Sequence, residues 1–244
     1  MSKIVNYVIV ENKQVAKETY VLTLKGPTNW IKAGKFFMLK IPGFYLRRPM
    51  APAYYDTKQF SFLYQIVGNG TDKLTTLIPG KKLSLLIDLG NGYQYNKKQG
   101  MPLLVAGGAG INPVLCLANE LDRQKVKYRM VVGYKNKSYV PHATFLKRLN
   151  KHAIICTDDG SYGFKGNVVD VIKKHQWQNM YYFTCGSMNM MKAVYKNCKQ
   201  GQLSLEARMG CGFGAGMGCA IKAKNGLIRV CKIGPAFESE DLLW

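Results

Sequence analysis

The chain has 244 residues, of which 47% are apolar and 20% are charged, and this balance excludes a disordered chain and allows one or two domains around a sizeable core. Lys and Arg number 35 against 14 Asp and Glu, which gives a net charge of +21. The basic residues are scattered and no helix-turn-helix, zinc-finger or RNP-type pattern occurs, so the sequence favours anionic cofactors over nucleic acid as binding partners.

The first 98 residues are predicted to be rich in β-strands. Short runs of β-branched and aromatic residues recur at close spacing, over residues 3–12, 19–26, 35–41, 60–68 and 81–90. Gly, Pro and Asn residues separate these runs, as is typical of short antiparallel strands. Five or six such strands predict an antiparallel β-barrel over residues 1–98, with one short helix at 72–77.

A different pattern begins near residue 99, where strands alternate with helices. An apolar strand, a glycine turn and a helix follow one another within residues 102–124. Later strands are predicted within 127–136, 152–160 and 180–187, and helices within 140–150, 166–175 and 188–200. This alternation predicts a doubly wound α/β domain over residues 99–203. A small cysteine module follows over 204–244, so the predicted fold class is α+β and multi-domain.

The glycine turn Ala106–Pro113, AGGAGINP, is the clearest nucleotide-binding signal. Gly107, Gly108 and Gly110 would let a phosphate approach backbone N–H groups at the N-terminus of the following helix. The spacing differs from G-x-G-x-x-G, and a tight strand-to-helix turn would explain the same residues. The strand before the turn and the helix after it favour nucleotide binding.

Two weaker signals for phosphate binding lie in the β-rich region. The backbone amides of Gly70 and Thr71, in the segment VGNGT, could hold a phosphate, although a hairpin turn explains this segment as well. Arg47 and Arg48 precede Pro49 in YLRRPMAPAYY. An arginine pair beside an extended backbone suits a diphosphate and a flat ring, but an ordinary surface loop has the same composition.

Residues at the ends of predicted strands in the α/β region are further candidates for ligand binding. Cys185 ends the last predicted strand, at the sheet edge where ligands bind in open α/β folds. Asp158 and Asp159 follow an earlier strand, where they would either orient a ribose or cap their turn. The methionine-rich helix after Cys185 is typical of a core helix rather than of a cofactor contact.

The chain contains seven cysteines, and its N-terminal sequence, MSKIVNYVIVENKQ, is unlike a signal peptide. No apolar run reaches the roughly 20 residues of a membrane-spanning helix. We therefore expect a cytoplasmic protein without membrane contact, in which disulfides are uncommon. Cys116 and Cys156 lie in apolar runs and are predicted to be core residues.

Three cysteines in the C-terminal segment, Cys211, Cys219 and Cys231, lie close to glycines. A plant-type [2Fe–2S] site has the spacing C-x4-C-x2-C and a distant fourth cysteine. Counted from Cys211, Cys219 is the third ligand and Cys231 fits the fourth, but Gly216 stands at the second. A glycine loop with free thiols, or a three-cysteine zinc site completed from elsewhere, are the alternatives.

Taken in chain order, these features resemble the ferredoxin-reductase-like flavoproteins, and among them the electron-transfer subunit of two-subunit (class 1B) dihydroorotate dehydrogenase. The resemblance runs nearly end to end and rests on RRPM, YQIVGNGTDKLTTLIPGKKLSLL, LGNGY, GGAGINP, DDGSYGFKGNVVDVI, CGSMNMMKAV, SLEARMGCGFG and VCKIGPAF. It implies an FAD-binding β-barrel, an NAD(H)-binding α/β domain and a C-terminal [2Fe–2S] module. It also implies an FMN-containing catalytic subunit as partner, which oxidises dihydroorotate to orotate in pyrimidine biosynthesis.

The resemblance assigns roles to individual residues. The flavin-binding residues that it implies are Arg48, Pro49, Met50 and Ala51 of the RP-x-S segment, Gln65, Ile66 and Val67 of the next strand, and Gly70 and Thr71 at the diphosphate. The nicotinamide side would comprise Gly107, Gly108, Gly110, Cys185 and Gly186. The implied cluster ligands are Cys211, Cys219 and Cys231.

Four residues depart from the pattern of this family: Ala51 replaces a serine, Ser187 and Asp88 stand in place of prolines, and Gly216 replaces a ligand. Glycine has no side chain to coordinate iron, so the cluster needs water or an external thiol at this position, or is absent. Two alternative functions follow. One is a related reductase subunit with another partner, and the other is a degenerate paralogue that lacks a functional cluster.

Overall fold

Seven antiparallel strands form the first sheet of the structure, a computed structural model that describes residues 2–141 and 153–244. The strands are β1 (Lys3–Ala16), β2 (Thr19–Lys25), β3 (Phe36–Leu39), β4 (Arg48–Met50), β5 (Tyr54–Tyr55), β6 (Gln59–Gln65) and β7 (Lys82–Leu89), in the order β4-β3-β7-β1-β2-β6-β5. Helix α1 (Asn69–Thr75) follows β6 and overlaps the short helix expected at 72–77.

Aromatic side chains fill the inner side of this sheet. The ring of Phe37 meets the rings of Phe60 and Phe62 edge to face, with centroids 5.3 and 5.1 Å apart, and all three are buried. Edge-to-face rings pack favourably because the positive edge of one ring meets the negative face of the other. The sheet curls around this core into a half-barrel, which confirms the antiparallel architecture predicted for this part of the chain.

The second sheet is mostly parallel, with the order β11-β10-β9-β8-β12-β13-β16. Its strands are β8 (Leu103–Gly107), β9 (Arg129–Tyr134), β10 (Ala153–Thr157), β11 (Phe164–Lys165), β12 (Tyr182–Cys185), β13 (Gly201–Ser204) and β16 (Ala236–Glu238), of which only β16 pairs antiparallel. Its main helices are α2 (Ile111–Arg123), α4 (Val168–Lys174) and α5 (Met188–Asn197). The helix expected at 140–150 lies almost entirely outside the described residues.

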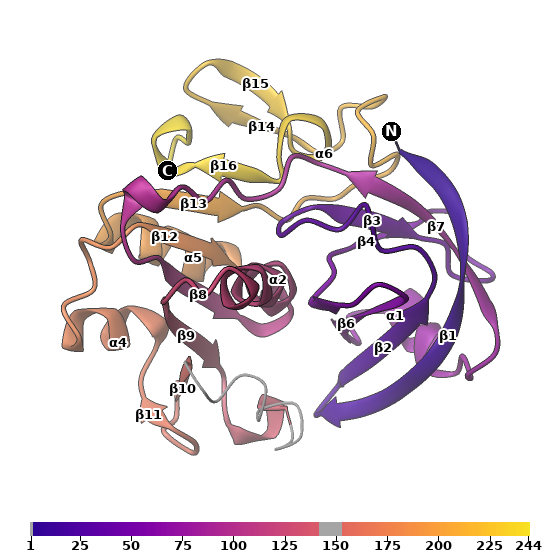
Figure 1. Cartoon of the computed structure of the whole chain (residues 1–244), viewed down its shortest axis with the longest axis horizontal. Helices are drawn as coiled ribbons and strands as arrows, with labels where there is room; N and C mark the ends of the chain where they lie inside the picture. The colour runs from indigo at the N-terminus through magenta and orange to yellow at the C-terminus, as the bar shows by residue number, and fades with distance from the viewer. Residues whose placement is uncertain (1, 142–152) are drawn as a thin grey trace.

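Alternate residues of the central strand β8 face two different layers. Leu104 and Ala106 pack in the same cluster as helix α2 and the half-barrel, whereas Leu103 and Val105 pack with α4 and α5. This alternation follows from the two-residue period of a strand. Helices therefore cover both faces of the sheet, as a doubly wound fold requires, and α2 lies between the two sheets (Figure 1).

The C-terminal segment crosses over both sheets and returns to the second one (Figure 1). After β13 the chain forms the cysteine loop (205–219), the hairpin β14 (Ala220–Ala223) and β15 (Gly226–Arg229), and helix α6 (Val230–Ile233). Strand β16 then pairs with β13. Cys219 and Cys231 pack with Phe36 and Met38 of β3, so the cysteine loop rests against the half-barrel.

Short 3-10 helices complete the description: η1 (Lys97–Gln99), η2 (Gly108–Gly110), η3 (Lys137–Tyr139) and η4 (Ser239–Asp241). No helix in the described ranges is both long and apolar enough to cross a membrane.

Candidate functional site

A cavity of about 300 Å³ lies where the half-barrel meets the second sheet. Pro49, Met50 and Ala51, from the end of β4, form one part of its wall. Gln65 from the end of β6 and Cys185 from the end of β12 form another. The structure thus brings together residues that the sequence places more than 130 positions apart. Because its walls are mostly apolar, this cavity suits a flat aromatic ring.

Arg48 and the segment before α1 meet at the edge of this cavity. A Cβ atom placed on Gly70 would lie 3.1 Å from Nη2 of Arg48, so the guanidinium lies directly against this glycine. The Thr71 hydroxyl accepts a hydrogen bond from the Val67 amide at 2.9 Å and fixes the loop. A guanidinium beside a glycine backbone is a suitable environment for a diphosphate. Ile66, the remaining predicted residue here, donates its amide to the Glu18 carbonyl at 2.9 Å.

Arg47, the neighbour of Arg48, has a structural role. Its guanidinium donates hydrogen bonds to the Met38 carbonyl at 3.3 Å and to the Ser84 carbonyl and hydroxyl at 2.8 and 3.0 Å. These contacts tie β4 to β3 and β7. Desolvation by burial lowers the pKa of Arg47, but an arginine stays protonated. Arg48 instead donates a hydrogen bond to the Leu46 carbonyl at 2.7 Å, and its guanidinium lies against Gly70.

A second cavity, of about 870 Å³, opens along the carboxyl ends of β8, β9 and β12. Gly107, Gly108 and Gly110 line it together with Gly186. A Cβ atom on Gly110 would lie 2.5 Å from both Cα and N of Gly186, so only glycine permits this close approach of α2 and β12. The predicted glycine turn and strand end therefore form one surface at the topological switch point, where α/β sheets bind nucleotides.

Asp158 also lines the second cavity, whereas Asp159 does not belong to its wall. The Asp159 carboxylate accepts hydrogen bonds from the amide and hydroxyl of Ser161 at 2.9 and 2.6 Å. Hydrogen bonds from Ser161 lower the pKa of Asp159. Asp159 thus caps its turn, whereas Asp158 lies in the wall of the second cavity.

Four residues line both cavities: Gln65, Val67, Gly110 and Glu206. Glu206 directly follows β13 and was not singled out by the sequence analysis, although it is an acidic residue at the end of a buried strand. Its side chain opens into the cavities, and desolvation by their walls raises its pKa. Burial, followed by the charge of Glu206, raises the pKa of Cys185 well above its ordinary value. Cys185 is therefore a neutral thiol and has no nucleophilic character.

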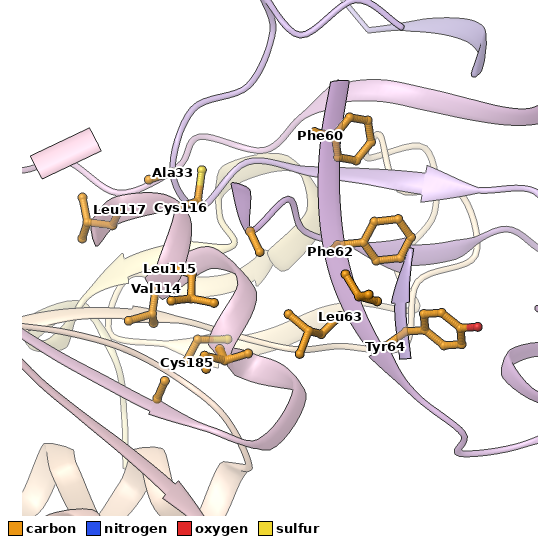
Figure 2. Close-up of a cluster of buried hydrophobic side chains, with 14 of the residues drawn as sticks. Ala33, Phe60, Phe62, Leu63, Tyr64, Val114, Leu115, Cys116, Leu117 and Cys185 are labelled. Atoms are coloured by element: carbon orange, nitrogen blue, oxygen red, sulfur yellow. The ribbon is translucent and has the colours of Figure 1, made fainter. Parts of the chain in front are cut away.

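One buried side chain joins the two sheets beside the first cavity. Oδ1 of Asn112, in the first turn of α2, accepts a hydrogen bond from the Leu63 amide at 2.9 Å. Its Nδ2 donates to the Leu63 carbonyl at 2.7 Å. Figure 2 shows Leu63 on the α2 side of β6 and Phe62 and Tyr64 on the opposite side. Asn112 thus pairs with β6 as a neighbouring strand would, beyond the end of the short strand β5.

Four residues depart from the family pattern, and the structure shows the surroundings of three of them: Ser187, Asp88 and Ala51. The Ser187 hydroxyl accepts a hydrogen bond from the Met190 amide at 3.3 Å and caps α5. Asp88 has φ of 63°, which proline cannot adopt, and its carboxylate lies 2.5 Å from Nζ of Lys35. Ala51 lines the first cavity without a polar side chain.

The three C-terminal cysteines lie in the cysteine loop and in α6. Sγ of Cys219 and Sγ of Cys231 are 3.2 Å apart, and both residues are buried. Burial, followed by the nearby Cys219 sulfur, raises the pKa of Cys231 to about 12. Cys211 differs: desolvation raises its pKa, but hydrogen bonds from the Gly216, Phe213, Ala215 and Gly214 amides prevail and lower it to about 6. The loop therefore holds the Cys211 sulfur as a thiolate.

The cysteines fit three of the four ligand positions of a two-iron cluster. Two sulfurs on one tetrahedral metal lie roughly 3.8 Å apart, from a metal–sulfur bond of about 2.3 Å. The Cys219–Cys231 separation of 3.2 Å needs only a small opening to reach this value. Within residues 2–141 and 153–244, no three His, Cys, Asp or Glu side chains surround a single metal position. A two-iron cluster divides its ligands between two metals, so a three-residue set around one ion is not required.

The family model for the "iron-sulfur cluster binding domain of dihydroorotate dehydrogenase B" matches residues 206–243. Among solved structures, an NADH-dependent reduced ferredoxin-NADP oxidoreductase superposes with a TM-score of 0.87 and 23% identity, covering 98% of this chain and 90% of its own. Phthalate dioxygenase reductase superposes with a TM-score of 0.67 and 17% identity, covering 79% of this chain and 63% of its own. The fold is therefore that of the ferredoxin-reductase-like proteins.

Relatives of known name identify a narrower family among the proteins with this fold. The "dihydroorotate dehydrogenase B (NAD(+)), electron transfer subunit" of Streptococcus pneumoniae serotype 4 is 36% identical over 95% of this chain and 97% of its own length. The subunit of the same name from Fusobacterium nucleatum is 34% identical over 98% of both chains. The chain belongs to the family of the electron transfer subunits of dihydroorotate dehydrogenase B.

Proposed function

We propose that this chain binds FAD and NAD(H) and passes electrons between them and an FMN-containing dihydroorotate dehydrogenase catalytic subunit. The observation that carries this proposal is the junction of the two cavities at Gln65, Val67, Gly110 and Glu206. A flavin ring in the first cavity and a nicotinamide in the second would meet there. Direct contact of the two rings is the condition for hydride transfer between them.

The residues of the first cavity are assigned to FAD. Pro49, Met50 and Ala51 would contact the flavin ring, and Arg48 with Gly70 would hold the diphosphate. When bound, FAD supplies the exchange between two-electron and one-electron chemistry. The protein contributes orientation and exclusion of water rather than a nucleophile, because Cys185 in the wall of the first cavity is neutral.

The residues of the second cavity are assigned to NAD(H). Gly107, Gly108 and Gly110 leave backbone room for the pyrophosphate at the start of α2, and Gly186 would lie beside the nicotinamide. Asp158 would accept a hydrogen bond from the ribose, a role that acidic residues have in sites for NAD.

A short path leads from the flavin cavity to the cysteines. Met38 of β3 pairs with Pro49 in the wall of the cavity. A Cβ atom placed on Gly212 would lie 2.5 Å from Cγ of Met38, so the cysteine loop touches the same strand pair. Cys211, Cys219 and Cys231 would hold an iron–sulfur cluster there, at the surface toward which a partner subunit would dock.

A reconstitution experiment tests this function. The purified chain is combined with an FMN-containing catalytic subunit encoded by the same genome, and dihydroorotate-dependent reduction of NAD is followed at 340 nm, a wavelength set by the cofactor's own chemistry. We expect reduction only when both subunits and FAD are present. A chain that retains no FAD after reconstitution would refute the proposal.

The absence of a membrane helix from the described residues supports a cytoplasmic location, where cysteines stay reduced.

A further inference from the structure

The cysteine loop contains a gap beside the sulfur of Cys211. Gly216 stands at the second ligand position, five residues after Cys211 in the same loop, and its amide is one of the backbone groups near this sulfur. Cys219 and Cys231 form the other part of the site, with their sulfurs 3.2 Å apart. Because these two sulfurs are close enough to share one metal, the missing ligand belongs to the metal that Cys211 alone would hold.

The space at residue 216 is open. A Cβ atom placed on Gly216 would meet no heavy atom of the described residues within 4 Å, and the residue is exposed. Its φ is not among the positive values found at Gly212 and Gly214, so the backbone there would accept a side chain. The position of the missing sulfur is therefore accessible from solvent instead of being filled by another part of the chain.

The charge around the gap is positive. The Arg229 guanidinium donates a hydrogen bond to the Gly214 carbonyl, and a Cβ atom on Gly214 would lie 2.8 Å from Cδ of Lys232. The sequence has no acidic residue between Ala207 and Phe237. Two basic side chains thus lie against Gly214 in the same loop and residues 207–237 contribute no carboxylate, so the charge near Gly216 favours an anion.

We propose that this site takes its fourth sulfur from solution, as the thiolate of a small thiol that also carries a carboxylate. This inference rests on the cluster assigned under the proposed function. Thiolate is the usual ligand of iron–sulfur clusters, the gap is open to solvent, and its surroundings favour negative charge. On binding, the thiol releases its proton to solvent and its sulfur replaces a water molecule on the metal, and no electron is transferred. The other three sulfurs come from Cys211, Cys219 and Cys231.

The test is anaerobic reconstitution of the full-length, FAD-loaded protein with ferrous iron and sulfide. Three thiols of similar size are compared: 3-mercaptopropionate (anionic), 2-mercaptoethanol (neutral) and cysteamine (cationic). Iron and acid-labile sulfide per FAD are measured after gel filtration, and the visible circular dichroism spectrum reports the ligand set. We expect the anionic thiol to act at about fivefold lower concentration than the neutral one, because one added charge pair near the surface contributes about 1 kcal/mol.

Two cysteine variants provide a matched comparison. Gly216→Cys supplies the missing sulfur, so it should retain iron without any added thiol. Gly210→Cys adds a cysteine one residue before Cys211, at a position that is equally open, and should still require the thiol. Both variants add one thiol to the same loop, and they differ only in the position of that thiol relative to Cys211.

Three results would overturn the proposal: equal iron retention by the unmodified protein with and without thiol, no iron in either the unmodified protein or Gly216→Cys, or equal rescue by Gly210→Cys. FAD content and NADH-dependent reduction of ferricyanide are measured on the same samples. If both persist while iron binding fails, the flavin function stands and only the thiol ligand is wrong. If both are lost, the proposed function itself fails.

Discussion

Asn112 offers a direct test of how the two sheets are held together. Its side-chain amide exchanges two hydrogen bonds, of 2.9 and 2.7 Å, with the backbone of Leu63, and both residues are buried. Asn112→Ala removes both partners and leaves the amide and the carbonyl of Leu63 without a hydrogen bond. Water can reach this contact only from the side of the first cavity, because both residues are otherwise buried.

The size of the effect follows from these two groups. A buried polar group left without its partner costs about 1–3 kcal/mol, and a carbonyl costs less than an amide, so we expect a loss of about 3 kcal/mol. For a protein of this size, 1 kcal/mol shifts Tm by roughly 2–4 °C, which predicts a fall of roughly 6–12 °C. FAD affinity should fall as well, since Leu63 and Asn112 both line the first cavity.

Thermal unfolding followed by circular dichroism, with and without added FAD, measures this loss. Asn119→Ala is the control on the same helix. Asn119 donates to the Ala53 and Leu115 carbonyls at 3.2 and 2.9 Å but is only half-buried, so its loss should cost about 1 kcal/mol. If both variants unfold at the same temperature, or if Asn112→Ala unfolds like the unmodified protein, the Leu63 contact does not hold the two sheets together.

Other parts of the site lead to three further predictions. Arg48→Ala should weaken FAD binding at least about tenfold, since a hydrogen bond to a charged group contributes about 1.5–3 kcal/mol. Arg47→Ala should mainly lower Tm. Fluorescence titration with FAD distinguishes the two variants, and equal losses of FAD affinity would contradict these roles. Gly110→Ala should lower the free energy of unfolding by about 1–3 kcal/mol, because the added Cβ overlaps the backbone of Gly186. In Gly68→Ala the added Cβ meets no described atom within 4 Å, so this control variant should unfold near the normal Tm. In iron-free protein, alkylation by iodoacetamide should rise with pH through a midpoint near 6 and then level off, because the thiolate of Cys211 is the reactive form. A midpoint near pH 9, or an unchanged profile in Cys211→Ser, would refute this assignment.

Local patterns in the sequence predicted most of the architecture. Alternating β-branched and aromatic runs predicted the antiparallel sheet, and the strand, glycine turn and helix around Ala106–Pro113 predicted the first α/β unit. The predicted helix at 188–200 ends three residues early, at Asn197, because Cys198 adopts extended backbone angles. These features were predictable because they depend on neighbouring residues.

The packing of segments that lie far apart in the sequence decided those parts of the candidate site that local patterns did not predict. Glu206 escaped the sequence analysis because a single acidic residue acquires meaning only when β13 places it between two cavities. Asn112 likewise looked like an ordinary residue of the glycine turn, and its bond to Leu63 spans 49 positions. No spacing rule indicates such a contact, because it depends on how α2 docks onto β6.

The sequence by itself determined the cysteine register, with Cys211, Cys219 and Cys231 at the first, third and fourth ligand positions and Gly216 at the second. It also determined the net positive charge and the glycines that permit close backbone approach. Only the tertiary structure decided that Cys219 and Cys231 form the close pair and that the gap at Gly216 is open to solvent. The physical reason is that spacing along a chain fixes which residues can serve as ligands, whereas packing of the loop against β3 and α6 fixes which sulfurs meet and what surrounds them.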